Sequence, residues 1–196
     1  MTFIYFFTCI LLIFIFVFDV YLGIKFFEYV YCANIKHQPP LVASNARLRQ
    51  HTLEQIMKHY PKSKNICEIG SGFGGLARAV AKRTKANVYA LENMPFSAFV
   101  SKTGDLLFGC QNNHSVWCDA FKYLDKTNKN FDVAIAYLGP IITPKIQQYK
   151  NKIRVLISLD FEIKDLKPVR VIDLSKYGYV IYKRVKYPHK LFIYEF

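Results

Sequence analysis

The sequence predicts an α/β fold with a mostly parallel β-sheet, a C-terminal antiparallel hairpin and an N-terminal transmembrane helix. Short apolar strands alternate with amphipathic helical stretches between residues 45 and 159, and this order requires a parallel sheet with helices on both faces. A glycine-rich turn follows the first of these strands, and the first two dozen residues are almost wholly apolar. The chain has 196 residues, so about 160 remain for one domain after the membrane segment.

The N-terminal segment has the length and composition of a membrane span. Phe3 to Phe18 carries no charge, Asp19 interrupts the apolar run, and the run then continues to Lys25. Roughly 20 such residues are needed to cross a hydrocarbon core about 30 Å thick. A cleaved signal peptide is the alternative, but residues 1–5 contain no Lys or Arg and no Ala-x-Ala site follows. The sequence therefore favours a retained anchor over residues 1–25, with membrane lipid as a partner.

Basic residues predict the orientation of this anchor. The nearest ones all follow the span and none precedes it: Lys25, Lys36, Arg47 and Arg49. The positive-inside rule then places the C-terminal part of the chain on the cytoplasmic side of the membrane, or on the matrix side of a mitochondrial one. Residues 26–44 are expected to form a juxtamembrane linker, with an extended backbone at Pro39 and Pro40, and residues 45–196 the α/β domain.

The elements of the domain follow from apolar periodicity and from turn residues. An amphipathic helix is expected over 45–60, because Leu48, Leu53 and Ile56 recur at helical spacing and Pro61 ends it. Further helices are expected at 75–84, 95–108 and, after a Thr-Pro cap, 143–150. Apolar strands are expected at 65–69, 87–91, 115–117, 131–136 and 154–159. Two β-rich runs, 179–186 and 191–196, are joined by a short Pro-containing segment and predict a hairpin.

The composition argues against a nucleic-acid or metal partner. The formal net charge is +13, but the lysines are spread along the chain without arginine clusters or an aromatic RNA-binding signature. This distribution favours a solvated and membrane-facing basic surface. Five cysteines show no Cys-x-x-Cys spacing, so no zinc site is expected. The histidines, His189 among them, form no triad or metal pattern and are expected at surface or packing positions.

The stretch from Asn65 to Gly75 carries the clearest chemical signal. It contains a strand with an acid, Glu68, near its end, followed by the turn residues Gly70, Ser71, Gly72 and Gly74. Glycines at such a strand-to-helix turn let backbone N–H groups approach a nucleotide ligand. Gly70, Gly72 and Gly75 also satisfy the dinucleotide pattern Gly-x-Gly-x-x-Gly, but a pyrophosphate gains nothing from a nearby carboxylate. Glu68 therefore favours a ligand with a cationic or amine group.

Two further acids end the next two strands. Glu92, followed by Asn93, closes the strand at 87–91, roughly 20–25 residues after the first acid, where a carboxylate can accept both hydroxyls of a ribose. Asp119 follows the strand at 115–117 and is placed to bind an adenine amino group. Because the carboxyl ends of parallel strands meet at one edge of a sheet, the three acids are expected to converge on one nucleotide cofactor.

The pattern Glu-x-Gly-x-Gly-x-Gly resembles the first motif of class I S-adenosylmethionine (SAM) methyltransferases. The resemblance implies a Rossmann-like sheet, SAM as the cofactor, and the residues above as its binding residues. Methyltransferases of this class line the transfer channel with residues after the fourth strand, so Tyr137 and Pro140 are the implied catalytic residues. Methyl transfer from a sulfonium is an in-line displacement, which needs alignment and exclusion of water but no metal.

Nearly the whole chain resembles a family of small membrane-anchored protein-lysine N-methyltransferases. Its members include the mitochondrial enzymes that modify the ATP synthase c-subunit and the adenine nucleotide translocase, together with bacterial relatives. The shared features are the N-terminal span, the Pro-Pro-x-Val segment at Pro39, the first motif, Glu92 and the Gly139-Pro140 turn. The family commonly has Asp and Gly-Asp-Gly in the first motif, where this chain has Glu68 and Gly-Phe-Gly.

This resemblance implies a methyltransferase domain over residues 45–196 that modifies a lysine side chain of a membrane or membrane-proximal protein. In that family the segment before the first helix helps to cover the cofactor and to guide the lysine, which gives Pro39 and Pro40 a place in the substrate channel. Two alternatives stay open. One is methylation of a small lipophilic molecule, and the other is a non-catalytic SAM-fold protein that acts as a membrane assembly factor.

Overall fold

The computed structural model describes residues 2–30, 44–182 and 184–196. The chain forms two units, Met1–Leu41 and Val42–Phe196, and each is described by itself. The first contains α1, Thr2–Val30, a helix of 29 residues that is about 43 Å long at 1.5 Å per residue. Its segment Tyr5–Ile24 is long and apolar enough to cross a membrane, a test of length and composition that a signal sequence also passes.

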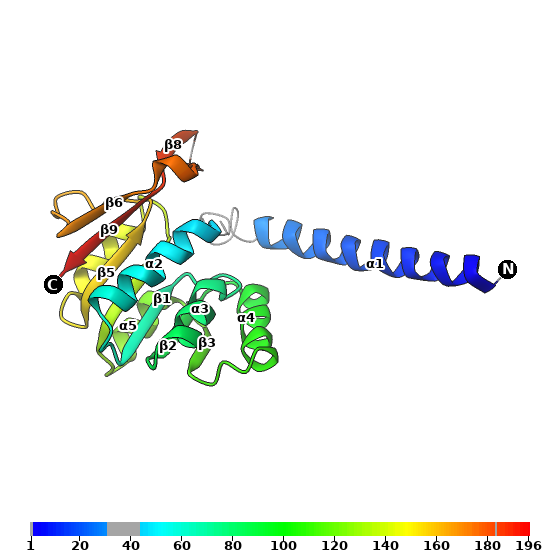
Figure 1. The fold of residues 1–196 in the computed structure, drawn as a ribbon, viewed down its shortest axis with the longest axis horizontal. Helices are drawn as coiled ribbons and strands as arrows, with labels where there is room; N and C mark the ends of the chain where they lie inside the picture. Colours follow the sequence, from blue (N-terminus) through cyan, green and yellow to red (C-terminus); the bar gives the residue numbers. More distant parts are fainter. Residues whose placement is uncertain (1, 31–43, 183) are drawn as a thin grey trace. The chain divides into compact units, whose positions relative to one another are not determined.

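The second unit is built on a seven-stranded sheet with the order β3-β2-β1-β4-β5-β9-β6 (Figure 1). Strands β1 to β5 pair in parallel, whereas β9 is antiparallel to both β5 and β6. The bounds are Asn65–Ile69 (β1), Asn87–Glu92 (β2), Asn113–Trp117 (β3), Phe131–Ala136 (β4), Ile153–Leu159 (β5), Arg170–Asp173 (β6) and Lys190–Glu195 (β9). This mostly parallel α/β sheet confirms the predicted fold class.

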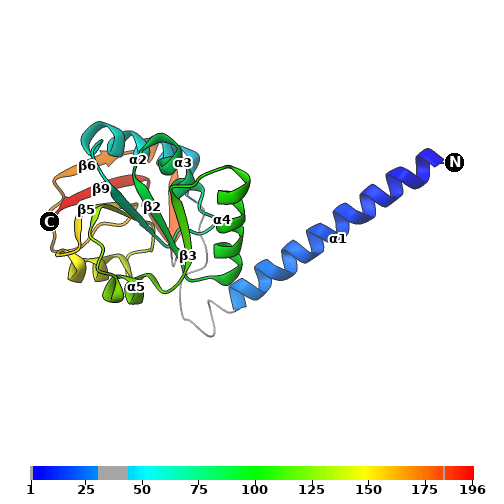
Figure 2. The same ribbon diagram turned by 90° about the horizontal axis from the view of Figure 1, so that it is seen from below.

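Helices cover both faces of the sheet (Figure 2). α2 (Ala46–His59) and α3 (Gly75–Arg83) pack on one face, and α5 (Ala120–Lys126) and the 3-10 helix η2 (Thr143–Tyr149) pack on the other. α4 (Pro95–Leu107) packs against β3 and β2. Side chains alternate along each strand, so Val155 of β5 joins the core under α2 and α3, whereas Leu156 joins the core beside α5.

The strand order determines where a ligand can bind. β1 pairs with β2 on one side and with β4 on the other, so the connections after β1 and after β4 lead to opposite halves of the sheet. Open α/β sheets bind ligands outside the carboxyl ends of their strands at this switch point. The glycine-rich turn directly follows β1 and therefore lies at that position.

Some local elements differ from the sequence-based expectation. α5 was not predicted, because its seven residues are too few to show a helical period. β3 begins at Asn113, two residues before the expected start. The short helix expected at 143–150 is present as η2, with 3-10 geometry over seven residues.

The predicted C-terminal hairpin is wrong, because the segments 179–186 and 191–196 do not pair with each other. β7 (Tyr179–Tyr182) instead folds back on β8 (Val185–Pro188) as a separate two-stranded sheet. β9 inserts between β5 and β6, and its residues from Leu191 to Tyr194 are buried. An apolar run indicates a strand but not its partner, so the sequence could not specify this insertion. β6 was not predicted, because four residues with alternating partial burial give too weak a signal.

The buried strand β5 gives a test of the fold. Leu156 is 0% exposed, and Leu156→Ala should lower the free energy of unfolding by about 2–5 kcal/mol, because it removes buried methyl groups and leaves a cavity. Leu106→Ala, on α4, is the matched control: Leu106 is 79% exposed, so the change should stay within about 0.5 kcal/mol. Urea unfolding of the full chain in detergent measures both. Equal effects of the two substitutions would contradict the placement of β5.

Candidate functional site

The turn after β1 presents backbone N–H groups at the carboxyl edge of the sheet. Gly70 N and Ser71 N donate to the carbonyl oxygen of Leu91 in β2, at 2.9 and 3.1 Å, which ties the turn to the neighbouring strand. Gly70 has a φ of 74°, and a Cβ at this position would lie 2.5 Å from Leu138 Cδ2. A side chain here would be strained and would collide with the segment after β4, so this turn depends on glycine.

Glu92 ends β2 and holds the same turn. The residue is 5% exposed; its Oε2 accepts from Gly72 N and its Oε1 from Met94 N, both at 2.7 Å. Hydrogen bonds to a charged carboxylate are stronger than neutral ones, so the two bonds fix the carboxylate against the turn. A carboxylate oxygen can accept more than one hydrogen bond, which allows both oxygens to accept ribose hydroxyls as well. The next residue, Asn93, is half-buried, and its carbonyl accepts from Trp117 Nε1 at 3.1 Å.

Glu68 lies near the end of β1 and points at the first turn of α3. Its Oε2 accepts from Ala77 N at 2.9 Å, and it supplies a capping acceptor that Gly74, the N-cap residue, has no side chain to provide. Burial, and then the Glu92 carboxylate, raise the pKa of Glu68 to about 8, against the opposing effects of the Ala77 N–H and of Arg49 and Arg78. A cationic group bound beside Glu68 would favour its charged form.

Ser71 indicates that the turn is built for a ligand. The residue is 7% exposed, and its Oγ has no hydrogen-bond partner among the described residues. A buried hydroxyl without a partner costs about 1–3 kcal/mol. The polar groups of a nucleotide cofactor at this turn would satisfy it. The glycine turn, the unpartnered hydroxyl and the two acids therefore fit such a cofactor.

Asp119 follows β3 and is the N-cap of α5. Its Oδ1 accepts from Phe121 N at 2.9 Å and from Lys122 N at 3.3 Å, whereas Oδ2 makes no hydrogen bond within the part of the chain that the structure describes. The preceding residue, Cys118, donates its N–H to the Glu92 carbonyl at 2.8 Å. Asp119 thus lies at the end of the strand beside Glu92, with one carboxylate oxygen available for a ligand.

The segment after β4 borders this turn on its other side. Leu138 approaches Gly70, and the Tyr137 ring stacks on Phe161 with 5.8 Å between centroids. Burial, and then the Asp160 carboxylate, raise the pKa of Tyr137 well above its usual value, so its hydroxyl stays protonated at physiological pH. Pro140 is half-buried in the turn that continues towards η2.

A buried polar network supports the glycine turn from the side of α4. Arg78 Nη2 donates to the Phe73 carbonyl at 2.6 Å, and its Nη1 donates to the Ser101 carbonyl at 3.0 Å. Asp105 is 8% exposed and accepts from Asn113 Nδ2 at 2.7 Å. The sequence did not single out these residues, because polar positions on a helix are usually solvated. The network fixes the turn and takes no direct part at the sheet edge.

The sequence also missed a pair of buried residues at the end of β5. His189 was expected at a surface or packing position, but it is 6% exposed and its Nδ1 lies 2.9 Å from Asp160 Oδ2. Asp160 directly follows β5, as Glu92 and Asp119 end or follow their strands, and this shared position is the signal that could have found it. No sequence signal pointed to His189, which lies directly before β9 and meets Asp160 because β9 pairs antiparallel with β5, with Leu191 opposite Leu159.

Most of the residues predicted for the site lie close together in the structure. Glu68, the glycine turn, Glu92 and Asp119 occupy the ends of the three adjacent strands β1, β2 and β3, and Tyr137 follows β4 beside them. Pro39 and Pro40, predicted for the substrate channel, lie outside the described residues. Within the described ranges, no three His, Cys, Asp or Glu side chains form a group that could hold a metal ion.

No protein-family model and no curated protein sequence matches the chain. Among solved structures, the chain is similar to an RNA methyltransferase from Salinibacter ruber in complex with S-adenosyl-L-homocysteine; the TM-score is 0.64 and the identity 16%, over 79% of this chain and 93% of that one. It is also similar to an rRNA methylase from Streptococcus thermophilus, with a TM-score of 0.57 and 12% identity over 78% and 99% of the two chains. A precorrin 8w decarboxylase from Methanobacterium thermoautotrophicum has a TM-score of 0.57 and 16% identity over 82% and 94%.

These similarities establish the fold. The Val42–Phe196 unit has the fold of class I SAM-dependent methyltransferases, as the first-motif resemblance implied. At such low identities the fold does not specify a substrate, and one of the three similar proteins is named as a decarboxylase. The chemistry of this chain must therefore be argued from its own residues.

The raised pKa of Glu68 predicts a pH dependence of stability. Its folded-state pKa of about 8 exceeds the unfolded value of 4.5, so the folded state binds more protons between these values. Stability should therefore fall as pH rises from about 5 to 8, by an amount on the order of a few kcal/mol. Glu68→Gln, which cannot ionise but can still accept from Ala77 N, should remove this decline. Denaturant unfolding at several pH values measures it, and parallel pH profiles for both proteins would contradict the assignment.

Proposed function

We propose that the protein is a membrane-anchored SAM-dependent methyltransferase that modifies lysine side chains of a membrane or membrane-proximal protein. The observation that carries the proposal is the pair of hydrogen bonds by which the Glu92 carboxylate holds the glycine turn at the switch point of the sheet. The Glu92 carboxylate borders this turn and would repel a pyrophosphate, and a cationic group bound beside Glu68 would favour the charged form of that acid. An adenosyl sulfonium with an amino group suits them better.

The proposed roles of the cofactor residues follow from their positions. Glu92 accepts the ribose hydroxyls, and Asn93 lies beside it. Asp119 accepts from the adenine amino group through Oδ2, while its Oδ1 caps α5. Glu68 and Ser71 face the amino-acid part of the cofactor, and Gly70, Gly72 and Gly74 allow its close approach. When bound, SAM supplies a methyl group on a positively charged sulfur.

The residues after β4 are proposed to align the acceptor and to exclude water. Leu138 lies against Gly70, which places the β4 segment next to the cofactor turn. Tyr137 contributes an aromatic wall and a protonated hydroxyl, and Pro140 fixes the backbone of the following turn. In-line displacement depends mainly on this alignment and on a dry environment.

The membrane and lysine parts of the proposal rest on the N-terminal region and on the family resemblance. α1 contains a segment long enough to span a bilayer, which supports an anchor over residues 1–25. Basic residues follow this segment, which supports a cytoplasmic or matrix location for residues 45–196. Residues 26–30 belong to α1, so the remainder of 26–44 would link anchor and domain, with Pro39 and Pro40 guiding a lysine to the site.

A second candidate function is methylation of a small lipophilic molecule. Four aromatic rings gather at the ends of β4 and β5: Phe161 lies within 6.0 Å, between centroids, of Tyr137, Tyr182 and Tyr187. Rings in this arrangement can bind an apolar acceptor as well as an alkylammonium group. The two candidates differ in where the transferred methyl group is found.

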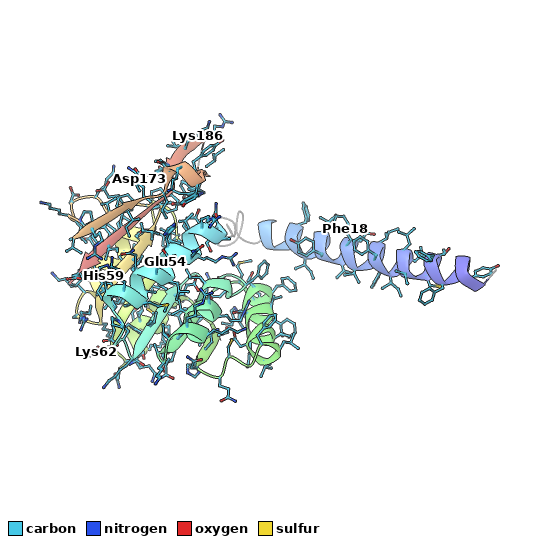
Figure 3. The ribbon with its side chains drawn as sticks, viewed as in Figure 1. Phe18, Glu54, His59, Lys62, Asp173 and Lys186 are labelled. Atoms are coloured by element: carbon cyan, nitrogen blue, oxygen red, sulfur yellow. The ribbon has the colours of Figure 1, made fainter. Side chains whose placement is uncertain are left out.

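Glu92 tests the cofactor site. The full chain should bind S-adenosylhomocysteine in isothermal titration calorimetry, and Glu92→Ala should weaken binding at least about tenfold, because it removes the ribose acceptor and releases the turn. Glu54→Ala is the control: Glu54 is an exposed acid on α2 (Figure 3), so its loss should leave binding unchanged. Circular dichroism checks that each variant is folded. Absence of binding by the unaltered chain would refute the proposed function.

Transfer of a radiolabelled methyl group tests the acceptor. Membranes from cells that lack the protein are incubated with labelled SAM and the purified full chain. Label should appear in a protein band and, after hydrolysis, in methyllysine. Label in an organic extract would establish the lipophilic acceptor instead, and label in RNA would contradict both. Cofactor binding without any transfer would favour a non-catalytic assembly factor.

A further inference from the structure

The Asp160–His189 pair is the most strongly buried pair of ionisable side chains near the candidate site. The two side chains are 0% and 7% exposed, and Asp160 Oδ2 lies 2.9 Å from His189 Nδ1. Asp160 Oδ1 accepts from Lys190 N at 3.0 Å, so both oxygens of the carboxylate are engaged. These two hydrogen bonds fix the orientation of the Asp160 carboxylate relative to the His189 ring.

Asp160 adopts an unusual backbone conformation to reach His189. Its φ is 64°, in the left-handed region that non-glycine residues visit rarely, although Asp is among those enriched there. The residue comes directly after β5, at the same edge of the sheet as Glu68 and Glu92. Strained positions of this kind cluster at functional sites and persist only when their surroundings enforce them.

The hydrogen bond to Asp160 determines which nitrogen of His189 can accept a proton. Burial raises the pKa of Asp160, whereas its hydrogen bonds with His189 and the Lys190 N–H oppose that rise and favour the carboxylate. When Asp160 is ionised it only accepts hydrogen bonds, so Nδ1 carries the hydrogen and Nε2 of the neutral ring is the acceptor. Nε2 makes no hydrogen bond within the described residues. The buried side-chain polar atoms without a partner there belong to Ser71 and Asn113, so Nε2 keeps some contact with solvent. Gly178 lies next to it: a Cβ at that position would be 3.5 Å from Nε2.

Contacts place this pair beside the proposed acceptor position. Burial and then the Asp160 carboxylate raise the pKa of Tyr137. Phe161, the next residue, stacks on the Tyr137 ring. β5 is separated from β1 only by β4, so the ends of β1 and β5 lie about 10 Å apart at the usual strand spacing, and His189 precedes β9 on the far side of β5. A base role for His189 therefore requires an acceptor whose nitrogen lies against the Tyr137 and Phe161 rings, between the glycine turn and the His189 ring.

We propose that His189 is a catalytic base that takes the proton from the ammonium group of the acceptor, and that Asp160 is the positioning residue that fixes its tautomer. This inference rests on the proposed function and adds to it the residue that accepts the proton of the lysine ammonium group. It explains why a histidine and an aspartate are buried together beside four aromatic rings. The arrangement has the logic of an Asp–His pair that activates a nucleophile.

The proposed step is balanced in protons and electrons. His189 Nε2 takes one proton from the ammonium group and leaves a neutral amine. The amine lone pair attacks the methyl carbon of SAM, so that a nitrogen–carbon bond forms and the carbon–sulfur bond breaks, with its electron pair left on sulfur. The products are an N-methylammonium group and S-adenosylhomocysteine. The imidazolium then releases its proton to water.

Lysine chemistry requires such a proton transfer. A free lysine side chain has a pKa of about 10.4, so only about one in 2,500 is neutral at pH 7. Burial beside the sulfonium lowers that pKa, and a base that removes the proton adds roughly 10²–10⁴-fold. A purely structural pair would hold the end of β8 near β5 and leave the rate of transfer unaffected once the protein is folded.

Two variants of the pair and one matched control test the inference. His189→Gln removes the base. Asp160→Asn keeps the shape and tolerates the left-handed backbone, but its amide can donate to Nδ1 and so remove the acceptor at Nε2. The control is His51→Gln, because His51 pairs with Glu54 at the same distance of 2.9 Å, but the two side chains are 25% and 49% exposed. Each full-length variant is assayed for S-adenosylhomocysteine binding and for single-turnover methyl transfer to membranes that lack the protein.

Both variants should bind S-adenosylhomocysteine as the unaltered chain does and transfer methyl groups about 10²–10⁴-fold more slowly. His51→Gln should retain the full rate, and in one further variant, His189→Ala, added imidazole should partly restore transfer. Full transfer by Asp160→Asn or His189→Gln would overturn the inference, as would loss of cofactor binding in both, which would show a structural pair. Absence of binding and transfer in the unaltered chain would instead refute the proposed function itself.

Discussion

The carboxylate of Glu92 is the interaction on which the geometry of the candidate site depends. It joins the N–H groups of Gly72 and Met94 through bonds of 2.7 Å, and so fastens the turn after β1 to the end of β2. This turn places Gly74 at the start of α3 and brings Gly70 against Leu138. Loss of this acid would leave two buried N–H groups without an acceptor, and each such group costs about 1–3 kcal/mol. The same atoms thus serve folding and, in the proposed function, recognition of the ribose.

Features with local sequence signals were predicted well. The alternation of strands and helices, the glycine turn and the acids at strand ends all follow from residues that lie close together in the chain, and the fold class is confirmed. Features that depend on distant pairing were not predicted. The position of β9 depends on which edge of the sheet remains open after the parallel strands have paired, and β7 pairs with β8 as a separate two-stranded sheet. His189 is the same kind of case, because the antiparallel pairing of β9 with β5 brings it to Asp160.

Residues predicted to bind the cofactor also make hydrogen bonds within the protein. Asp119 caps α5, and Glu68 accepts from the first turn of α3, so each carboxylate has a structural role that needs only one of its oxygens. A residue with both a structural and a binding role tolerates fewer substitutions than a residue that only binds a ligand. The assignment of these residues to a cofactor stays a prediction, since the likeness to solved methyltransferases at 16% identity or less describes their common fold. Ser71, whose buried hydroxyl finds no partner in the described protein, is the strongest local argument that something else binds there.

The interior position of β9 has a consequence for biosynthesis. The ribosome synthesises this strand after both of its neighbours, so β5 and β6 stay unbridged until β9 has left the exit tunnel. During that interval the outer side of β5 is an unpaired apolar edge, which is prone to pair with another chain. The nascent domain would therefore depend on chaperones until β9 has emerged from the exit tunnel. Synonymous codons that slow translation just before residue 190 would lengthen this vulnerable period.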